Sequence, residues 1–426
     1  MVKYLKKATN NLSEKMKDIP NRYRFRPEYI RRRRLIAAGI VAVILTVVIV
    51  VASLVLSSTA PTTSPNLTNL KSLAQSATKP VWPSYGSGAI GAIGFDGVLA
   101  EYGGQSTRPI ASITKIITAL VVLEAKPLNG NESGPSITLT QNDQRIYDLA
   151  VAAGAAVKPV TVGSSMTERE MIEAMLLPSA ANYSETLAMW AYGSVDEYLK
   201  AADNWLVTNN LIQTKVVDTS GLLPENISNP SDLINLGKLV VKNPSLASIV
   251  SLKKATISGV GEVSNSNQLL GVLGVDGIKT GTTSEAGACM LFSSVINVGN
   301  EKITIIGVLL GADDRGGQNT DIKALLSSVQ PGFKSVKLVS RGQEFAEYKT
   351  AWGQTSKLIS NKDTSSVIWS DTPISITVQA DKVSTLKSGE QKGEATIKVG
   401  AKVLKQPLIT DGSITSPNIL WRLTHF

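Results

Sequence analysis

The chain has 426 residues with 43 Lys and Arg against 34 Asp and Glu, and its net charge of +9 lies at the N-terminus. Residues 1–34 hold twelve basic and three acidic side chains, whereas the other 392 residues hold 31 of each sign. This distribution disfavours a basic nucleic-acid-binding domain. One cysteine, Cys289, and one histidine, His425, disfavour a disulfide framework, a zinc site and a histidine-based hydrolase. We expect no metal, no other cofactor and no nucleic-acid partner.

An uncharged stretch of 22 residues, Leu35–Leu56, follows directly on the four arginines Arg31–Arg34. A helix of that length, rising about 1.5 Å per residue, spans the roughly 30 Å hydrocarbon core of a bilayer. The sequence therefore predicts a basic cytoplasmic tail over 1–34 and a single-pass plasma-membrane anchor over 35–56, with the rest of the chain outside. The alternative is a signal peptide cleaved near Ser58-Thr59-Ala60, although signal cores usually run only about 7–15 residues.

Residues 57–80 are rich in Ser, Thr, Pro and Asn, which predicts a linker. After it, the short apolar runs Ala89–Phe95 and Gly97–Tyr102 predict a hairpin. Two β-rich runs, Gly287–Ile296 and Ile303–Leu310, predict further strands near the end of the same region.

Helical patterns dominate between these strands, to about residue 250. Thr167 and Glu170 form a capping-box pattern, and Asn229 before Pro230 marks a second helix start. We therefore expect a domain of mixed helices and strands over 81–330.

From about Phe333 the pattern changes to short alternating strands. Ile374–Val378 and Ala395–Val399 alternate with a period of two, and polar, Gly-containing turns lie between them. We expect a separate all-β domain over 333–426.

Ser112 and Lys115 lie three positions apart in the sequence S-I-T-K, in a helical pattern that follows Pro109. Residues at this spacing share one helix face, and the positive end of the helix dipole would lie near the hydroxyl. Burial near another cation would lower the proton affinity of Lys115, so it could accept the serine proton. By itself the spacing is common on exposed helices.

The second motif, Lys279-Thr280-Gly281, stands about 165 positions later, just before the apolar run that begins at Gly287. This placement suits a strand that lines a cleft with a cation and a hydroxyl. Each motif alone arises readily by chance, but the two in this order form a known set of catalytic motifs.

The chain from about 82 to 330 resembles the D-alanyl-D-alanine carboxypeptidases, which are low-molecular-mass penicillin-binding proteins that trim peptidoglycan stem peptides. The resemblance implies an α+β fold: a β-lactamase/transpeptidase-like domain, with an antiparallel sheet and a helical cluster, followed by a small all-β domain. The stretches that carry it are Arg108–Glu124 (RPIASITKIITALVVLE), Asp218–Leu222 (DTSGL), Asn265–Leu270 (NSNQLL) and Gly277–Gly287 (GIKTGTTSEAG), and residues 333–426 resemble the β-rich domain.

The same resemblance implies a role for each matched residue. Ser112 would attack the carbonyl of the penultimate D-Ala and form an acyl-enzyme, while Lys115 takes its proton. The N–H groups of Ser112 and Thr282 would form the oxyanion hole. Lys279-Thr280-Gly281 would hold the terminal carboxylate, and Ser179 would relay a proton to the leaving amine. A β-lactam would acylate Ser112 and inhibit the enzyme.

The middle motif departs from the family pattern. The family usually shows S-x-N after a Leu-Leu pair, whereas here Ser179 is followed by Ala181 at the Asn position and by Asn182 one position late. Asn182 either reaches the site through an altered backbone, since one helical residue turns by about 100°, or is an ordinary helix-capping residue. Arg315 lies where family members often carry a carboxylate-binding arginine. The alternative is that Arg315 is a solvent-exposed charge in a loop.

These observations predict a membrane-anchored serine hydrolase that removes the terminal D-Ala from stem peptides during cell-wall biogenesis. A D,D-endopeptidase is the nearest alternative. A β-lactamase is disfavoured because no E-x-x-L-N element is apparent to supply its water-activating Glu. The missing Asn at Ala181 favours a third reading, a non-catalytic or altered-specificity peptidoglycan-binding protein.

Overall fold

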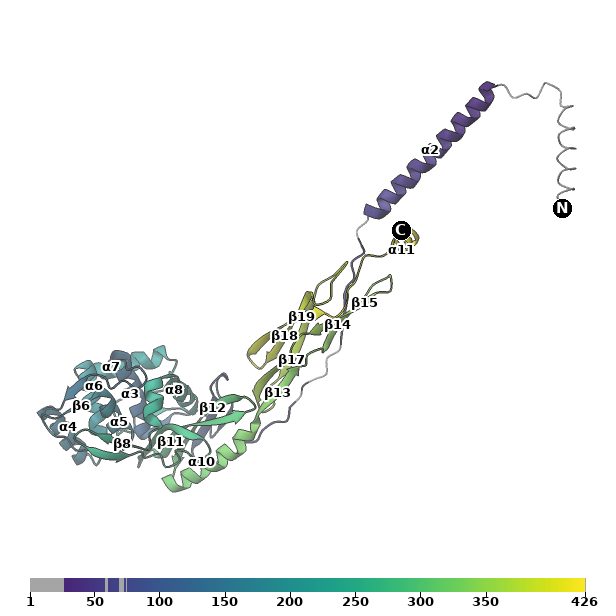
Figure 1. The fold of residues 1–426 in the computed structure, drawn as a ribbon. Helices are drawn as coiled ribbons and strands as arrows, with labels where there is room; N and C mark the ends of the chain where they lie inside the picture. Colours follow the sequence, from purple (N-terminus) through teal and green to yellow (C-terminus); the bar gives the residue numbers. More distant parts are fainter. Residues whose placement is uncertain (1–26, 58–59, 69–72, 74, 426) are drawn as a thin grey trace, which may run out of the picture.

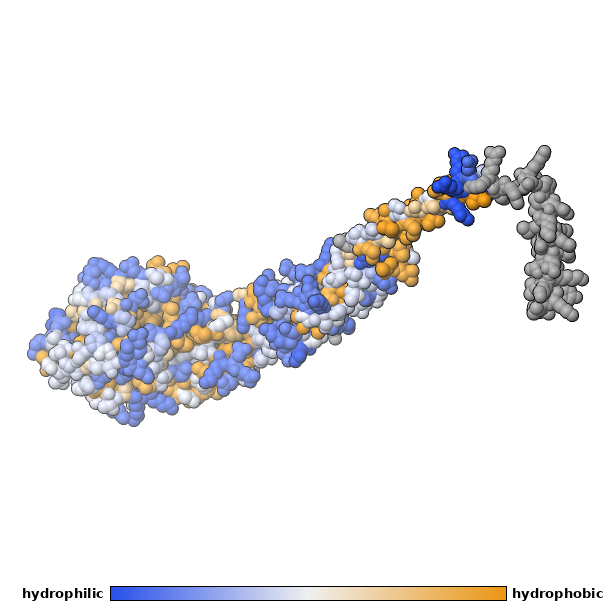
Figure 2. Space-filling model, turned by 45° about the horizontal axis from the view of Figure 1, so that its top comes forward, coloured by the Kyte–Doolittle hydropathy of each residue, from blue (hydrophilic) through white to orange (hydrophobic). Residues whose placement is uncertain are grey.

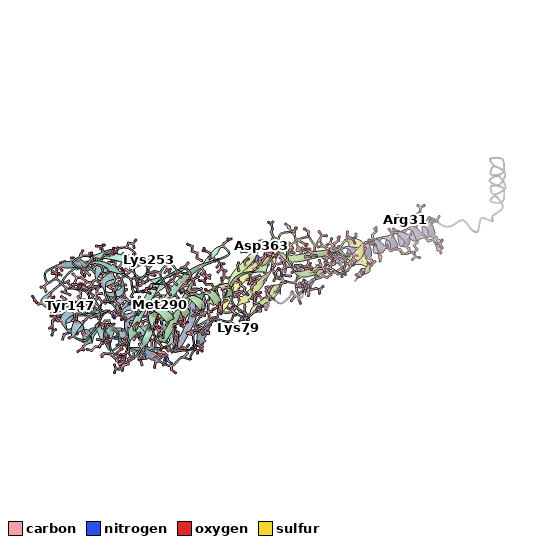
Figure 3. The ribbon with its side chains drawn as sticks, turned by 90° about the horizontal axis from the view of Figure 1, so that it is seen from below. Arg31, Lys79, Tyr147, Lys253, Met290 and Asp363 are labelled. Atoms are coloured by element: carbon pink, nitrogen blue, oxygen red, sulfur yellow. The ribbon has the colours of Figure 1, made fainter. Side chains whose placement is uncertain are left out.

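A computed structural model describes residues 27–57, 60–68, 73 and 75–425, so most of the predicted basic tail, residues 1–26, lies outside the described residues. The molecule is elongated, with helix α2 at one end, a β-rich module in the middle and a larger body at the other end (Figure 1). In Figure 3, Arg31, Asp363 and Tyr147 mark these three parts in that order. The predicted α+β architecture is confirmed.

Helix α2 (Pro27–Ser57) covers the uncharged stretch of the sequence. Its segment Glu28–Ser57 contains an 18-residue window with a mean hydropathy of 3.2, and it is the single helix within the described residues that is long and apolar enough to cross a membrane. Figure 2 shows an apolar surface along this helix and a hydrophilic group at the end where Arg31–Arg34 lie. An exposed apolar surface of this length suits contact with lipid better than contact with water.

The body is built around an antiparallel sheet of five strands in the order β10-β11-β12-β2-β3. The predicted hairpin is confirmed, because Gly88 pairs with Tyr102 and Ile90 pairs with Ala100. The two predicted β-rich runs are the long strands β11 and β12, and β10 lies at the sheet edge beside β11. The strands are β2 (Ser87–Ala92), β3 (Ala100–Tyr102), β10 (Val275–Thr283), β11 (Gly287–Val298) and β12 (Glu301–Ala312).

Helices cover both faces of this sheet. Helix α8 packs on β2, β11 and β12 within the larger core, and α10 packs on β11 and β12 within a second core. Helix α3 lies deep in the larger core, with ten of its twelve residues buried. The helices are α3 (Thr114–Ala125), α4 (Gln141–Ala152), α5 (Glu168–Leu176), α6 (Ala181–Tyr192), α7 (Val195–Thr208), α8 (Pro230–Lys242), α9 (Pro244–Val250) and α10 (Arg315–Val329).

Both predicted helix starts in the body are confirmed. Thr167 and Glu170 form the capping box of α5, and Asn229 caps α8, whose first residue is Pro230. Short two-stranded pairs complete the body; they are β4 (Arg108–Pro109) with β7 (Ile227–Ser228), β5 (Ser136–Thr138) with β6 (Ser165–Thr167), and β8 (Lys254–Ile257) with β9 (Gly261–Ser264).

The β-rich module follows the short helix η3 (Gln330–Gly332). Its two predicted alternating runs are β17 and β18, which pair with Val378 opposite Ala395. One sheet has the order β1-β14-β15-β19-β18-β17, and β13 pairs with β16 beside it. The elements are β13 (Phe333–Val339), β14 (Glu344–Lys349), β15 (Thr355–Ser360), β16 (Thr364–Trp369), β17 (Ile374–Ala380), β18 (Gln391–Val399), β19 (Lys402–Thr410) and α11 (Ile419–Thr424).

The segment predicted as a linker, 57–80, is in part a strand of this module and not a free tether. Strand β1 (Pro65–Leu67) pairs with β14, and Thr63 exchanges main-chain hydrogen bonds of 2.6 and 3.0 Å with Val383. Proline is tolerated here because β1 is an edge strand. The module has a core of its own, and Phe333, Val367 and Trp369 also pack into the second core of the body.

Candidate active site

The Ser112 and Lys115 side chains meet at the start of helix α3. Ser112 lies in the one-turn helix η2 (Ala111–Ile113), and Lys115 lies in the first turn of α3. Lys115 Nζ donates to Ser112 Oγ at 3.0 Å and to the carbonyl oxygen of Ser220 at 2.8 Å. The amine is therefore held between a hydroxyl that it could deprotonate and a main-chain acceptor.

Two glycines let neighbouring segments approach this turn closely. A Cβ at Gly281 of β10 would lie 2.9 Å from the nitrogen of Ser112, and a Cβ at Gly221 would lie 2.7 Å from Thr114 Oγ1. Ala111 has a φ of +47°, a left-handed conformation that costs a non-glycine residue about 1–3 kcal/mol. The surrounding segments hold this turn in place, which fixes the serine relative to β10.

Burial lowers the pKa of both lysines at the site. Lys115 is 2% exposed and Lys279 is 1% exposed. Burial lowers the pKa of Lys115 to about 7, against the opposing charge of Asp218. Burial and the charges of Lys115 and Arg315 lower the pKa of Lys279 well below its usual value. An amine with a pKa near 7 is partly neutral at neutral pH, so Lys115 can accept a proton.

The Ser220 carbonyl that holds Lys115 is itself fixed by a turn around Asp218. The Asp218 carboxylate accepts the N–H groups of Ser220 and Gly221, each at 2.6 Å, and that of Leu223 at 2.7 Å. Burial raises the pKa of Asp218, but these hydrogen bonds outweigh burial and lower it overall. The sequence showed only that Asp218–Leu222 resembles the family. The contact between the Ser220 carbonyl and Lys115 joins residues that are far apart in the chain, so the spacing of motifs does not reveal it.

Strand β10 carries the second group of candidate residues. Lys279 Nζ donates to the carbonyl of Thr280 at 3.0 Å, and Thr280 Oγ1 shares a hydrogen bond of 2.7 Å with Ser266 Oγ. Thr282 Oγ1 accepts from Nη2 of Arg315, the first residue of α10. Arg315 Nη1 is buried without a partner among the described residues. A partly unpaired guanidinium beside a buried ammonium is typical of a site for an anionic ligand.

Ser179 and Asn182 of the middle motif differ in their hydrogen bonding. Ser179 lies in the loop before α6 with a φ of +65°, and its hydroxyl has no hydrogen-bond partner within the described ranges. Asn182 is 1% exposed, and its amide both accepts from and donates to the main chain of Lys158, at 3.1 and 3.0 Å. The Asn182 amide is therefore engaged by the loop after α4, whereas the hydrogen bonds of Lys115 go to Ser112 and Ser220.

No metal-binding cluster accompanies these residues in the part of the chain that the structure describes, because no three His, Cys, Asp or Glu side chains gather there. Cys289 lies opposite Gly281 on β11 and is buried. Burial raises the pKa of its thiol to about 11, so it stays protonated and is a poor metal ligand.

Comparisons with known proteins point to one family. A family model described as D-alanyl-D-alanine carboxypeptidase matches residues 95–314. The D-alanyl-D-alanine carboxypeptidase DacD of Escherichia coli is 26% identical over 259 residues, which cover 60% of this chain and 65% of that protein. A D-alanyl-D-alanine endopeptidase of Haemophilus influenzae is 29% identical over 217 residues, covering 50% and 70%. The chain thus spans slightly less than two thirds of the E. coli protein.

A solved structure extends the likeness beyond the body. It is a peptidoglycan synthesis regulatory factor (PBP3) from Streptococcus pneumoniae, 20% identical with a TM-score of 0.57, and the match covers 79% of this chain and all of that one. At this identity the likeness concerns the fold alone. It supports an architecture, shared by the two chains, in which a body is joined to a β-rich module.

The contact between Asn182 and Lys158 can be tested by substitution. Asn182→Ala removes two part-buried hydrogen bonds to the main chain of Lys158, so we expect a loss of about 1–3 kcal/mol in the free energy of unfolding. Hydrogen exchange at the Lys158 amide should accelerate in the variant. Chemical denaturation and exchange measured by mass spectrometry check both effects. An unchanged unfolding free energy together with a lost serine reactivity would instead mean that Asn182 acts directly in the site.

Proposed function

The chain belongs to the D-alanyl-D-alanine carboxypeptidase family, and we propose that it removes the terminal D-Ala from peptidoglycan stem peptides through an acyl-enzyme on Ser112. The observation that carries this proposal is the Lys115–Ser112 hydrogen bond of 3.0 Å beside a second buried ammonium, that of Lys279. A nucleophile, a base with a pKa near 7 and a binding group for a carboxylate are thereby combined in one site.

In the acylation step, neutral Lys115 takes the Ser112 proton while Oγ attacks the carbonyl carbon of the penultimate D-Ala. The main-chain N–H groups of Ser112 and Thr282 stabilise the oxyanion that forms. Collapse of the tetrahedral intermediate breaks the peptide bond, and the leaving amine takes a proton that Ser179 relays. Water then hydrolyses the ester and releases the shortened peptide.

The terminal carboxylate of the substrate lies against β10. Thr280 and Lys279 supply a hydroxyl and a buried cation, and Gly281 allows the close approach of the serine turn. The partnerless Nη1 of Arg315 adds a second cationic donor, which supports the carboxylate-binding reading of this arginine. A β-lactam presents a carboxylate and a strained carbonyl in a similar arrangement, so it acylates Ser112 and inhibits the enzyme.

Two alternatives have an observation in their favour. The relative from H. influenzae is named an endopeptidase, and hydrolysis of a cross-link uses the same acyl-enzyme chemistry. A non-catalytic or altered-specificity binding protein is favoured by Ala181 and by the Asn182 amide, which is engaged by Lys158.

We also propose that α2 anchors the protein in the plasma membrane, with the N-terminus in the cytoplasm and the body outside. Arg31–Arg34 at one end of an apolar helix support this orientation, because positive charge beside a membrane span favours the cytoplasmic side. The body would then meet peptidoglycan in the extracytoplasmic space.

A fluorescent penicillin that does not cross membranes tests reactivity and orientation together. Intact cells that carry the full-length chain should be labelled, and Ser112→Ala should abolish labelling because it removes the nucleophile. The purified protein in detergent should release D-Ala from a pentapeptide that ends in D-Ala-D-Ala.

The other outcomes of this experiment separate the alternatives. Labelling without release of D-Ala from either a pentapeptide or a cross-linked dimer identifies a binding protein, and release from the dimer alone identifies an endopeptidase. Rapid hydrolysis of the penicillin identifies a β-lactamase. Protein that is labelled only after cell lysis contradicts the orientation, and protein that is never labelled contradicts the role of Ser112.

The rate of acylation should depend on pH through Lys115. The lysine acts as a base in its neutral form, and its pKa is about 7. Below that pH the second-order rate constant for penicillin acylation should fall by about tenfold per pH unit, and above it the rate should level off. Stopped-flow labelling between pH 5 and 9 measures the profile, with circular dichroism as the control for folding. A flat profile across this range would rule out titration of the base.

Recognition of the carboxylate by Arg315 is tested with paired substrates. Arg315→Leu should reduce kcat/KM for a peptide acid by about tenfold or more, because a charge-assisted hydrogen bond is lost. The corresponding C-terminal carboxamide should be cleaved at the low, unchanged rate of the wild type. Lys323→Leu, which removes an exposed cation from the same helix, is the matched control. Equal losses for acid and carboxamide would mean that Arg315 only maintains the fold.

A further inference from the structure

The segment Asn265–Leu270 lies between strands β9 and β10, and its contacts connect two sides of the active site. The Ser266 hydroxyl shares a hydrogen bond of 2.7 Å with Thr280 Oγ1 on β10. The Ser266 N–H donates to the carbonyl of Leu177 at 2.9 Å, and Leu177 stands two residues before Ser179. Ser266 therefore joins the strand that carries the proposed carboxylate site to the loop of the middle motif.

Two asparagines, one on each side of Ser266, hold this residue in place. The Asn265 amide donates to the carbonyl of Leu252 at 2.9 Å. Asn267 is 4% exposed, and its amide donates to the carbonyl of Gly277 on β10 at 3.1 Å. Because both neighbours are hydrogen-bonded to the main chain of other segments, the Ser266 hydroxyl keeps its position against β10.

The hydroxyl pair of Ser266 and Thr280 has one hydrogen more than the contact between the two residues uses. Each hydroxyl can donate one hydrogen, and neither oxygen has another hydrogen-bond partner among the described residues. If Ser266 donates, the hydrogen of Thr280 stays free for a ligand. If Thr280 donates, it offers a ligand only lone pairs. An anion beside Thr280, which is 3% exposed, selects the first arrangement.

We propose that Ser266 is a positioning residue for the terminal carboxylate of the substrate: it donates to Thr280 Oγ1 and thereby directs the Thr280 hydrogen toward the carboxylate. Two hydrogen bonds in series polarise each other, so the contact with the carboxylate is stronger than one from an isolated hydroxyl. Ser266 acts through Thr280 and does not touch the ligand. This inference rests on the proposed function, because it deepens carboxylate recognition at the same site.

A double-substitution cycle separates this role from a merely structural one. The second-order rate constant for acylation by a fluorescent penicillin, whose carboxylate takes the place of the peptide carboxylate, is measured on the full-length protein in detergent. Ser266→Ala should lower this rate constant by about fivefold, the contribution of one ordinary hydrogen bond. In a Thr280→Val background the same substitution should have no effect, because the hydroxyl that Ser266 directs is absent.

Two further variants complete the experiment. Ser266→Thr keeps the hydroxyl and should retain the wild-type rate constant. Ser264→Ala, which removes an exposed hydroxyl from β9 two residues earlier, is the matched control and should also retain it. An equal loss from Ser266→Ala in both backgrounds, or no loss in either, would overturn the inference. Release of D-Ala from a pentapeptide is measured separately; acylation by penicillin without release of D-Ala would overturn only the proposed hydrolysis.

Discussion

The burial of two ammonium groups in one site is the constraint on which the rest of the structure depends. Lys115 and Lys279 are both nearly inaccessible, and each is held by a main-chain carbonyl and not by a carboxylate. For Lys115, burial without a paired acid favours the neutral amine, which is what a base needs. A paired carboxylate would instead keep the base protonated, so the turn that saturates Asp218 keeps that acid from serving as a direct partner.

Close packing at the serine turn serves this same constraint. Gly281 has no side chain, so β10 can lie against the nitrogen of Ser112, and both lysines and the serine hydroxyl lie close together. Each of these segments comes from a distant part of the chain, and the five-stranded sheet brings them together. The sheet and α3 therefore act as a frame that fixes the positions of the groups around a single turn, the one that carries Ser112.

The period of the apolar residues and the spacing of short motifs predicted several of the helices and strands in this frame. The capping box at Thr167, the hairpin after the linker and the two β-rich runs depend on local chemistry, which a sequence displays directly. The strand at Pro65–Leu67 was missed because its pairing partner lies almost 300 residues away, and because the amino-acid composition of this segment is that of a linker. The Ser220 carbonyl was missed for a similar reason, because a backbone acceptor carries no motif.

The substitution at Ala181 changes what the middle motif can do without emptying the site. Ala181 lines a cavity of about 290 Å³ between α4, α6 and the segment 218–223, so a larger side chain at this position would enter that space. Asn182, one position later, hydrogen-bonds the main chain of Lys158 instead. The base is then oriented by the Ser220 carbonyl, whose own position is set by Asp218. The small side chain at 181 thus leaves space beside Ser220, the residue whose carbonyl orients the base.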